Sequence, residues 1–202
     1  MTSGRIGLFG GAFDPPHLAH RALIESALAT LRLDQLLVLP TGDAWHKSRT
    51  LTSAPHRLAM CELAFGDLPG VAVDRRELDR PGSTYTIDTV EALARERPGS
   101  HWFLLIGQDQ YRSFTTWRRW QDLIGLVTLV VAARPEGPTD GVLPAVPDAG
   151  QVPFQRLDMP LSPISSTAIR ELAAQGSPRL AALVSEPVAS YISTHSLYQQ
   201  PS

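Results

Sequence analysis

Two histidines near the start of the chain, His17 and His20, stand three residues apart and closely follow two glycines, Gly10 and Gly11. The glycines end an apolar run, and apolar residues at helical spacing extend over residues 18–31. The sequence therefore predicts a strand, a tight glycine turn and a helix. Residues three apart share one face of a helix, so the first turn of this helix would present both imidazoles together.

This arrangement suits the binding of a phosphate group. The first N–H groups of a helix lack intrahelical acceptors, and the helix dipole makes that end positive. Glycines let backbone amides approach an anion closely because no Cβ intervenes. Pro15 and Pro16 fit the first helical turn, where a missing N–H costs nothing. We expect the dipole to lower the pKa of both histidines and a bound polyphosphate to raise it again.

Simpler roles for the histidines stay open at this point. Either histidine could cap the helix or lie on the surface. A metal site would need a third protein ligand, and no nearby residue is an obvious one. The combination of glycines, prolines and two imidazoles favours chemistry on a polyphosphate.

A second helix start, far along the chain, carries Ser165, Ser166 and Arg170. Either serine is a good N-cap. Arg170 lies about one turn inside, and helical side chains lean toward the N-terminus, so its guanidinium could reach an anion above the cap. Capping alone would explain the serines, and an arginine at such a position is often simply solvated.

Composition sets the broad class. The chain has 202 residues, 43% of them hydrophobic and 19% charged, which predicts a single globular domain over residues 1–202. A net charge of −2 argues against a nucleic-acid partner. One cysteine, Cys61, excludes an intrachain disulfide, and we expect it in the core. With no signal segment and no run long enough for a membrane, the sequence predicts a cytoplasmic protein.

Strand-like and helical segments alternate along the chain. Strands are predicted at residues 6–9, 36–39, 71–73, 102–106, 126–132 and 154–157, and helices at 18–31, 57–65, 87–97, 118–124, 167–175 and 187–193. Repeated strand–helix–strand units predict an α/β fold: a Rossmann-like, doubly wound parallel sheet. Residues 135–163 hold seven of the 17 prolines and are predicted to form a surface excursion.

Ligands of such sheets bind beyond the carboxyl ends of the strands, so the residues there are the next candidates. Asp109 follows a strand closely and could accept hydrogen bonds from ribose hydroxyls. Tyr85 and Thr86 lead into a helix, where their backbone amides could hold a carboxylate. Trp117 could stack on a base, although a core position is the more common role of a tryptophan. Lys47 is the only lysine among 18 basic residues, and it either binds phosphate or stands there by chance.

Taken together, these segments resemble a known enzyme family. The first motif is similar to the nucleotidylyl transferase signature, with Ala19 where that family usually has glycine, and we expect only a small effect of this methyl group. The order of all the motifs along the chain resembles bacterial nicotinate-nucleotide adenylyltransferases from Ile6 to Tyr198. The motifs are Gly-Gly-x-Phe-Asp-Pro-x-His (10–17), His-Lys (46–47), Ser-x-Tyr-Thr (83–86), Ile-Gly-Gln-Asp (106–109), Thr-Trp (116–117), Arg-Pro (134–135) and Ser-Ser-Thr-x-x-Arg (165–170).

The resemblance implies a role for particular residues. It implies that His17, His20 and Arg170 are catalytic and contact the ATP phosphates. It further implies an ATP-binding set and a mononucleotide-binding set, in which Trp117 stacks on the pyridine ring and the amides of Tyr85 and Thr86 hold its carboxylate. The ATP-binding set is Gly10, Gly11, Phe13, Lys47, Gly107, Asp109, Arg134, Ser165 and Ser166, and the mononucleotide-binding set is His46, Tyr85, Thr86 and Trp117.

The implied reaction joins nicotinate mononucleotide to the AMP part of ATP and releases pyrophosphate. The attacking phosphate oxygen is already ionised near pH 7, so no general base is needed. Mg²⁺ would be held mainly by the ATP phosphates, with few or no protein ligands. Two alternatives are a pantetheine-phosphate adenylyltransferase, which shares the first motif, and an ATP-binding module without turnover.

Overall fold

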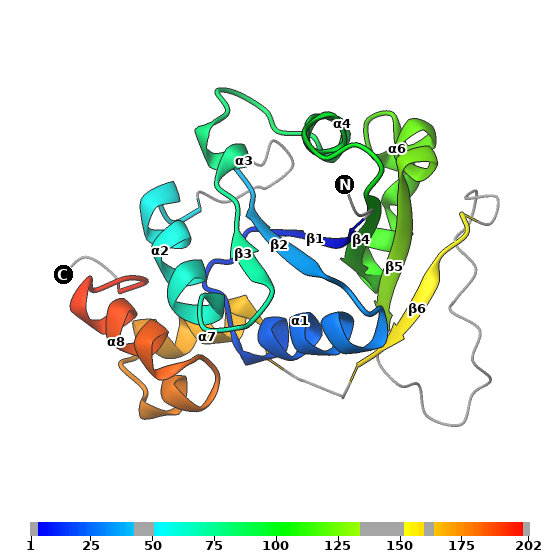
Figure 1. The fold of residues 1–202 in the computed structure, drawn as a ribbon. Coiled ribbons are helices and arrows are strands. Elements are labelled where there is room, and N and C mark those ends of the chain that lie inside the picture. Colours follow the sequence, from blue (N-terminus) through cyan, green and yellow to red (C-terminus); the bar gives the residue numbers. More distant parts are fainter. Residues whose placement is uncertain (1–3, 43–50, 134–151, 160–163, 200–202) are drawn as a thin grey trace.

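The computed structural model describes residues 4–42, 51–133, 152–159 and 164–199. Its centre is one sheet of six strands, all parallel, in the order β3-β2-β1-β4-β5-β6 (Figure 1). The strands are β1 (Arg5–Gly11), β2 (Gln35–Pro40), β3 (Val71–Val73), β4 (His101–Gly107), β5 (Val127–Ala133) and β6 (Gln155–Asp158). This strand order is that of a Rossmann-type doubly wound sheet, as the sequence predicts.

Helices connect the strands and close the chain. They are α1 (Leu18–Thr30), α2 (Ala54–Phe65), α3 (Arg76–Asp79), α4 (Thr86–Glu96), α5 (Gln108–Arg112), α6 (Trp120–Leu126), α7 (Ser166–Ala174) and α8 (Glu186–Thr194), with short 3₁₀ turns at Phe114–Thr116 and Pro178–Ala182. Among the described residues, none of these helices has the length and apolar character needed to cross a bilayer.

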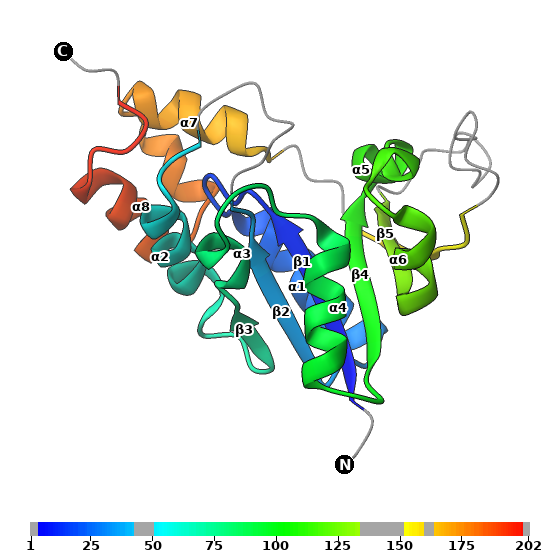
Figure 2. The same ribbon diagram turned by 90° about the horizontal axis from the view of Figure 1, so that it is seen from above.

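Both faces of the sheet are covered, which explains its unbroken apolar strands. In β4, Phe103 and Leu105 join one buried cluster, whereas Trp102, Leu104 and Ile106 join the other. The first cluster includes α1, α2, α7 and α8, and the second includes α4 and α6. Figure 1 shows α1 below the sheet and α4 and α6 above it, and Figure 2 shows α4 in front of the strands. A strand buried on both faces needs apolar residues at successive positions.

The predicted elements are confirmed with shifts of a few residues at their ends. Leu126, predicted to begin a strand, instead ends α6. The helices α3 and α5 have four and five residues, too few to give a periodic pattern, and were not predicted. Cys61 is fully buried, as expected, and burial raises the pKa of its thiol.

The strand predicted at residues 154–157, inside the proline-rich span 135–163, is confirmed with a shift of one residue. Within that span, residues 155–158 form β6, which pairs with β5 and places Leu157 in the core. The four residues of β6 include no proline, so all of them can pair with β5. Residues 134–151 and 160–163 lie outside the described part of the chain.

Candidate active site

The strand order reverses between β1 and β4, which is where such sheets bind ligands. A cavity of about 470 Å³ opens at this point. Its wall combines the end of β1, the loop after β2, the start of α4 and the segment from α5 to Arg118. The lining residues that enter the argument below are Gly10, Gly11, Glu77, Thr84, Tyr85, Thr86, Thr89, Asp109, Trp117 and Arg118.

The chain turns after the two glycines and not at them. Gly10 and Gly11 are the last residues of β1 and pair with Leu39 and Pro40 of β2, which corrects the prediction of a glycine turn. A Cβ on Gly10 would meet nothing within 4 Å, so its backbone borders open space. Pro15 and Pro16 likewise precede the helix instead of forming its first turn, because His17 is the N-cap of α1.

Phe13 bends the turn and supports a histidine. Its φ of 46° lies in the left-handed region. Its side chain is 2% exposed and packs against Phe9, Phe65 and His20, with ring centroids 5.1 Å apart in the pair with His20. The sequence placed Phe13 in the ATP-binding set. Its ring packs in the core between α1 and α2, so the predicted contact with ATP would come from its backbone.

The imidazole rings of His17 and His20 are stacked, with centroids 3.6 Å apart and planes 18° apart. The backbone N–H of His17 donates a hydrogen bond to Nδ1 of His20 (3.3 Å). An accepting ring nitrogen carries no proton, so the neutral ring of His20 holds its proton on Nε2. Within the described residues, Nδ1 of His17 is buried without a hydrogen-bond partner. The two rings are therefore held in place, and Nδ1 of His17 could still form a hydrogen bond with a ligand.

Burial keeps both rings neutral. It lowers the pKa of His17 from 6.5 to about 4. Burial first, and then repulsion from His17, lower the pKa of His20 well below 6.5. The predicted direction is confirmed. The predicted cause was the helix dipole; the cause found in the structure is loss of hydration, since these rings lie between the loop and the core.

The helix α7 begins beside the same loop. Ser165 is its N-cap, with Oγ accepting a hydrogen bond from the N–H of Ala168 (3.3 Å). Ser166 instead donates from Oγ to the carbonyl oxygen of Pro15 (3.0 Å). Arg170 donates from Nη1 to the carbonyl oxygen of Asp14 (2.8 Å) and from Nη2 to Oγ1 of Thr167 (3.0 Å). The guanidinium thus leans toward the helix start, as predicted, and there binds the loop that precedes His17.

Asp14 is the point where distant parts of the chain meet. It is 1% exposed. The hydroxyl of Tyr198 donates to Oδ1 (2.8 Å), and the N–H of Thr52 donates to Oδ2 (3.2 Å). Burial and the nearby Asp14 carboxylate raise the pKa of Tyr198, so its phenol remains a donor at neutral pH. Arg57, also buried, donates to the carbonyl oxygen of Ala12 (3.0 Å) and fixes the start of the loop.

The opposite wall of the cavity begins at α4. Tyr85 is the N-cap of this helix and Thr86 its first residue, so the pair stands where helical N–H groups have no intrahelical acceptor. Arg118 places its guanidinium carbon 4.5 Å from the centre of the Tyr85 ring. Trp117 is half-buried, with its ring 5.2 Å from that of Phe114, and also lines the cavity. Both predicted roles of Trp117, core packing and ligand contact, are therefore compatible with its position.

A buried acid lies behind this wall. Glu77 accepts a hydrogen bond at Oε1 from the hydroxyl of Thr89 (2.9 Å), and Arg80 donates to the same hydroxyl (3.3 Å). Burial raises the pKa of Glu77. A Cβ on Gly42 would overlap the carbonyl oxygen of Glu77, so only glycine lets the loop after β2 pass α3 this closely.

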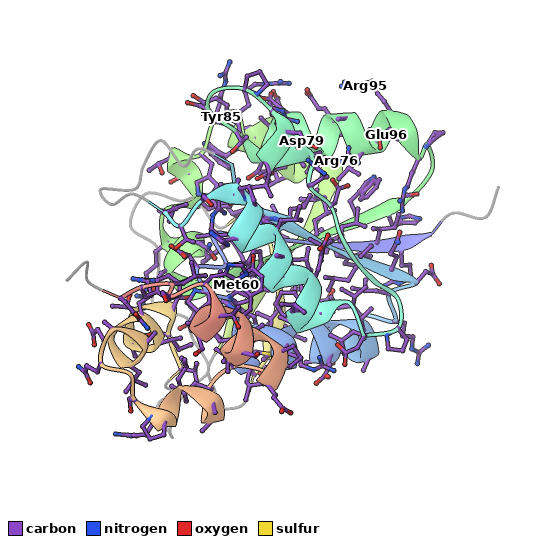
Figure 3. All side chains as sticks on the ribbon, turned by 90° about the vertical axis from the view of Figure 1, so that its left-hand side faces the viewer. Met60, Arg76, Asp79, Tyr85, Arg95 and Glu96 are labelled. Atoms are coloured by element: carbon purple, nitrogen blue, oxygen red, sulfur yellow. The ribbon has the colours of Figure 1, made fainter. Side chains whose placement is uncertain are left out.

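Ion pairs hold α3 against α4. Arg76 bonds to Asp74 (2.8 Å) and, at the far end of α4, to Glu96 (2.9 Å). Figure 3 shows Tyr85 and Glu96 at opposite ends of α4, with Arg76 beside Glu96. The start of α4 is thus the cavity end of an anchored helix.

Asp109 and Gly107 lie at the end of β4. The Asp109 side chain is 96% exposed and pairs with Arg112 (3.1 Å). Gly107 is the N-cap of α5, and its N–H donates to Oε1 of Gln110 (2.8 Å). Within the described residues, no group of three or more His, Cys, Asp or Glu side chains is placed to hold a metal ion.

The structure thus divides the predicted site into two groups. Gly10, Gly11, Tyr85, Thr86, Asp109 and Trp117 line the cavity. A second group, on or beside the loop after β1, consists of His17, His20, Phe13, Ser165, Ser166 and Arg170, and Gly107 lies beside the cavity at the end of β4. The predicted residues His46, Lys47 and Arg134 lie outside the described part of the chain.

No role for Asp14, Glu77 or Arg118 was predicted from the sequence, and only Arg118 had a local signal that could have revealed it. Asp14 belongs to the first motif, but nothing in its type shows that residues 52, 170 and 198 would meet it. Arg118 follows Trp117 directly and could have been found by asking which charges flank a candidate stacking ring. Glu77 lies in a helix too short to be predicted.

The fold and this site define a class of protein: a nucleotidyltransferase with a Rossmann-like sheet. Residues 8–172 match the family model described as cytidylyltransferase-like. A solved structure of Plasmodium falciparum nicotinic acid mononucleotide adenylyltransferase complexed with NaAD has the same fold, with a TM-score of 0.72 and 17% identity over 96% of this chain and 97% of that one.

Curated relatives narrow the class. The chain is 49% identical to a protein of Albidiferax ferrireducens over 96% of this chain and 98% of the relative, and 45% identical to one of Methylibium petroleiphilum over 98% and 93%. Both relatives bear the name "Probable nicotinate-nucleotide adenylyltransferase". The chain belongs to the nicotinate-nucleotide adenylyltransferase family.

Proposed function

We propose that this protein transfers the adenylyl group of ATP to nicotinate mononucleotide, giving deamido-NAD and pyrophosphate, in NAD biosynthesis. Family membership over nearly the whole chain supports the reaction. The observation that carries it is the pairing, across the sheet's switch point, of a cavity large enough for a nucleotide with an adjoining loop that carries two histidines and an arginine.

We call Asp14, His17, His20, Ser166 and Arg170 the phosphate side. On this side the ATP phosphates would lie against the start of α1 and α7, where N–H groups and positive dipole ends favour anions. The histidines and Arg170 would stabilise charge on the α-phosphate and on the leaving pyrophosphate. Their fixed positions favour this role, because a donor that is already in place needs no reorganisation during the reaction.

We call Tyr85, Thr86, Trp117 and Arg118 the pyridine side. Trp117 would stack on the pyridine ring, and the amides of Tyr85 and Thr86 would hold its carboxylate. With both substrates bound, a phosphate oxygen of the mononucleotide attacks the α-phosphorus of ATP. The new P–O bond forms as the bond between the α-phosphorus and the bridging oxygen breaks, and pyrophosphate leaves with that electron pair.

Mg²⁺ would arrive with ATP as part of the substrate. Phosphate oxygens are good ligands for this ion, which keeps several of its waters and needs few protein groups. The described residues fit this arrangement, since they offer donors to phosphate and no acidic cage. Asp109 and Gly107, at the end of β4, would face the ribose and the base of ATP.

A pyrophosphate-release assay with the purified protein tests the function. ATP with nicotinate mononucleotide should release pyrophosphate and form deamido-NAD, whereas ATP with 4′-phosphopantetheine should not. Release of pyrophosphate with ATP and 4′-phosphopantetheine, but not with ATP and nicotinate mononucleotide, would support the alternative, a pantetheine-phosphate adenylyltransferase. A thermal shift with ATP but no release with either acceptor would indicate a binding module.

A further inference from the structure

Arg118 differs from Arg119 and Arg76, which both form ion pairs with carboxylates. Arg119, the next residue, bonds to Glu91 (2.8 Å) and Asp122 (2.7 Å), and Arg76 bonds to two carboxylates. Within the described part of the chain, no carboxylate is paired with Arg118. Its guanidinium lies over the Tyr85 ring.

The positive charge of Arg118 stands out among the residues that line the cavity. Among the described lining residues, Arg118 is the only basic one, and the acidic ones are Glu77 and Asp109. Asp109 is paired with Arg112, and Glu77 is bonded to Thr89. Neither acid is paired with Arg118, so among the described lining residues this guanidinium is a positive group for which no hydrogen bond is formed within the described part of the chain.

The contact with Tyr85 still allows the guanidinium of Arg118 to donate hydrogen bonds to a ligand. A guanidinium over an aromatic face is attracted through its flat side, while its N–H groups point outward in the plane. That planar fork can bind a carboxylate through two parallel hydrogen bonds. Tyr85, whose ring lies under the Arg118 guanidinium, is also the N-cap of α4. An anion bound by Arg118 would therefore lie near the start of this helix as well.

We propose that Arg118 is a specificity-determining residue that binds the carboxylate of the pyridine ring and so favours nicotinate over nicotinamide mononucleotide. This rests on the proposed function. The carboxylate is the favoured partner over the 5′-phosphate because Arg118 stands beside the two groups assigned to the ring, the adjacent Trp117 and the start of α4. A neutral amide in place of the carboxylate would lose the charge-assisted bonds.

Kinetics with both mononucleotides test the assignment. For the wild type we expect kcat/KM to be at least roughly tenfold higher with nicotinate mononucleotide. Arg118→Gln should lower that value about tenfold while changing the value for nicotinamide mononucleotide less than about threefold, so the preference largely disappears. Arg118→Lys keeps the charge but not the planar fork, and should retain part of the preference.

Arg119→Gln is the matched control, since it removes the same charge one residue away and outside the cavity wall. It should leave the preference unchanged. If Arg118→Gln weakens both mononucleotides equally, the residue acts on the phosphate or on the cavity's shape, and the proposal is wrong. An unchanged preference would also overturn it.

A binding measurement separates this proposal from the proposed reaction. Quenching of tryptophan fluorescence gives Kd for each mononucleotide without turnover, and the ratio of Kd values should fall with Arg118→Gln as the kinetic ratio does. Absence of pyrophosphate release by the wild type would contradict the reaction alone. Equal Kd ratios in the wild type and the Arg118 variant would contradict the role of Arg118 alone. A melting curve for each variant shows whether it is folded.

Discussion

The phosphate side and the pyridine side of the site differ in how far the protein itself satisfies their polar groups. On the phosphate side, the loop after β1 receives hydrogen bonds from Thr52, Arg57, Ser166, Arg170 and Tyr198. On the pyridine side, Arg118 rests on Tyr85 without a carboxylate partner among the described residues, and Trp117 lines an open cavity.

The difference follows from what each side has to do. Charge that develops during the reaction is best stabilised by groups already fixed in position. The hydrogen bonds that fix the loop on the phosphate side therefore favour a high catalytic rate. Recognition requires groups that the ligand can still satisfy, and the Arg118 guanidinium, which has no carboxylate partner among the described residues, is such a group on the pyridine side. We therefore expect changes on the phosphate side to act mainly on kcat and changes on the pyridine side mainly on the mononucleotide KM.

The largest effect should come from the histidine pair. Replacing either His17 or His20 with alanine should lower kcat by roughly 10²–10³, the range for losing one fixed charge-stabilising donor. Mononucleotide binding should change much less. Steady-state kinetics with each substrate varied in turn would measure both. His101→Ala is the control, because His101 is exposed at the start of β4, away from the carboxyl ends of the strands. If the histidine variants changed only the mononucleotide KM and not kcat, the proposed difference between the phosphate side and the pyridine side would be wrong.

Trp117→Ala should have the next largest effect, on the other side of the comparison. A stacked ring contributes on the order of 1–3 kcal/mol to the binding free energy. Without it, the mononucleotide KM should rise several-fold to about 100-fold while the ATP KM stays nearly constant. Trp120→Ala is a matched control, since Trp120 also packs on Phe114 but does not line the cavity. Equal loss of thermal stability and equal kinetics in the two variants would show that Trp117 is a core residue only.

A smaller effect is expected from Tyr198→Phe, which keeps the ring and removes the hydrogen bond to Asp14. Bonds to charged groups contribute about 1.5–3 kcal/mol, part of which would appear as lost stability, so kcat should fall about tenfold with little change in the mononucleotide KM. Tyr191→Phe removes a comparable hydroxyl, which contacts His56 and not the loop. If both variants alter only the melting temperature, Tyr198 has a purely structural role.

The smallest expected signal is proton uptake when ATP binds. In the free protein the pKa of His17 is about 4, so the ring is neutral at higher pH, and nearby phosphates should raise this pKa. Protons are then taken up between the free and the bound pKa, so uptake should be larger at about pH 5.5 than at about pH 7.5. Activity should decline as pH rises through the bound value.

Calorimetry of ATP binding in buffers of different ionisation enthalpy measures this uptake, and the alanine variants of the two histidines provide the blank. Zero uptake at every pH would mean that the histidines act as neutral donors. Charge stabilisation would then depend on Arg170 and Mg²⁺, and the phosphate side would differ from the pyridine side by its fixed geometry alone.

Much of the fold could be predicted from local pattern. Strands such as β2 and β4 are buried on both faces, so they appear as continuous apolar runs, and glycines and prolines mark where they end. Helices of nine residues or more showed their apolar spacing. The short helices α3 and α5 lacked a local signal, because packing against neighbouring elements decides them.

For the site, the sequence by itself determined which residues could hold phosphate, because glycines, histidines and a helix start have that capacity wherever they occur together. Only the tertiary structure decided that Phe13 turns into the core, that burial lowers the pKa of both histidines, and that Arg118 has no acidic partner among the described residues of the cavity wall. The contact between Asp14 and Tyr198 joins residues 184 positions apart. Burial and pairing depend on such distant neighbours, which local sequence does not specify.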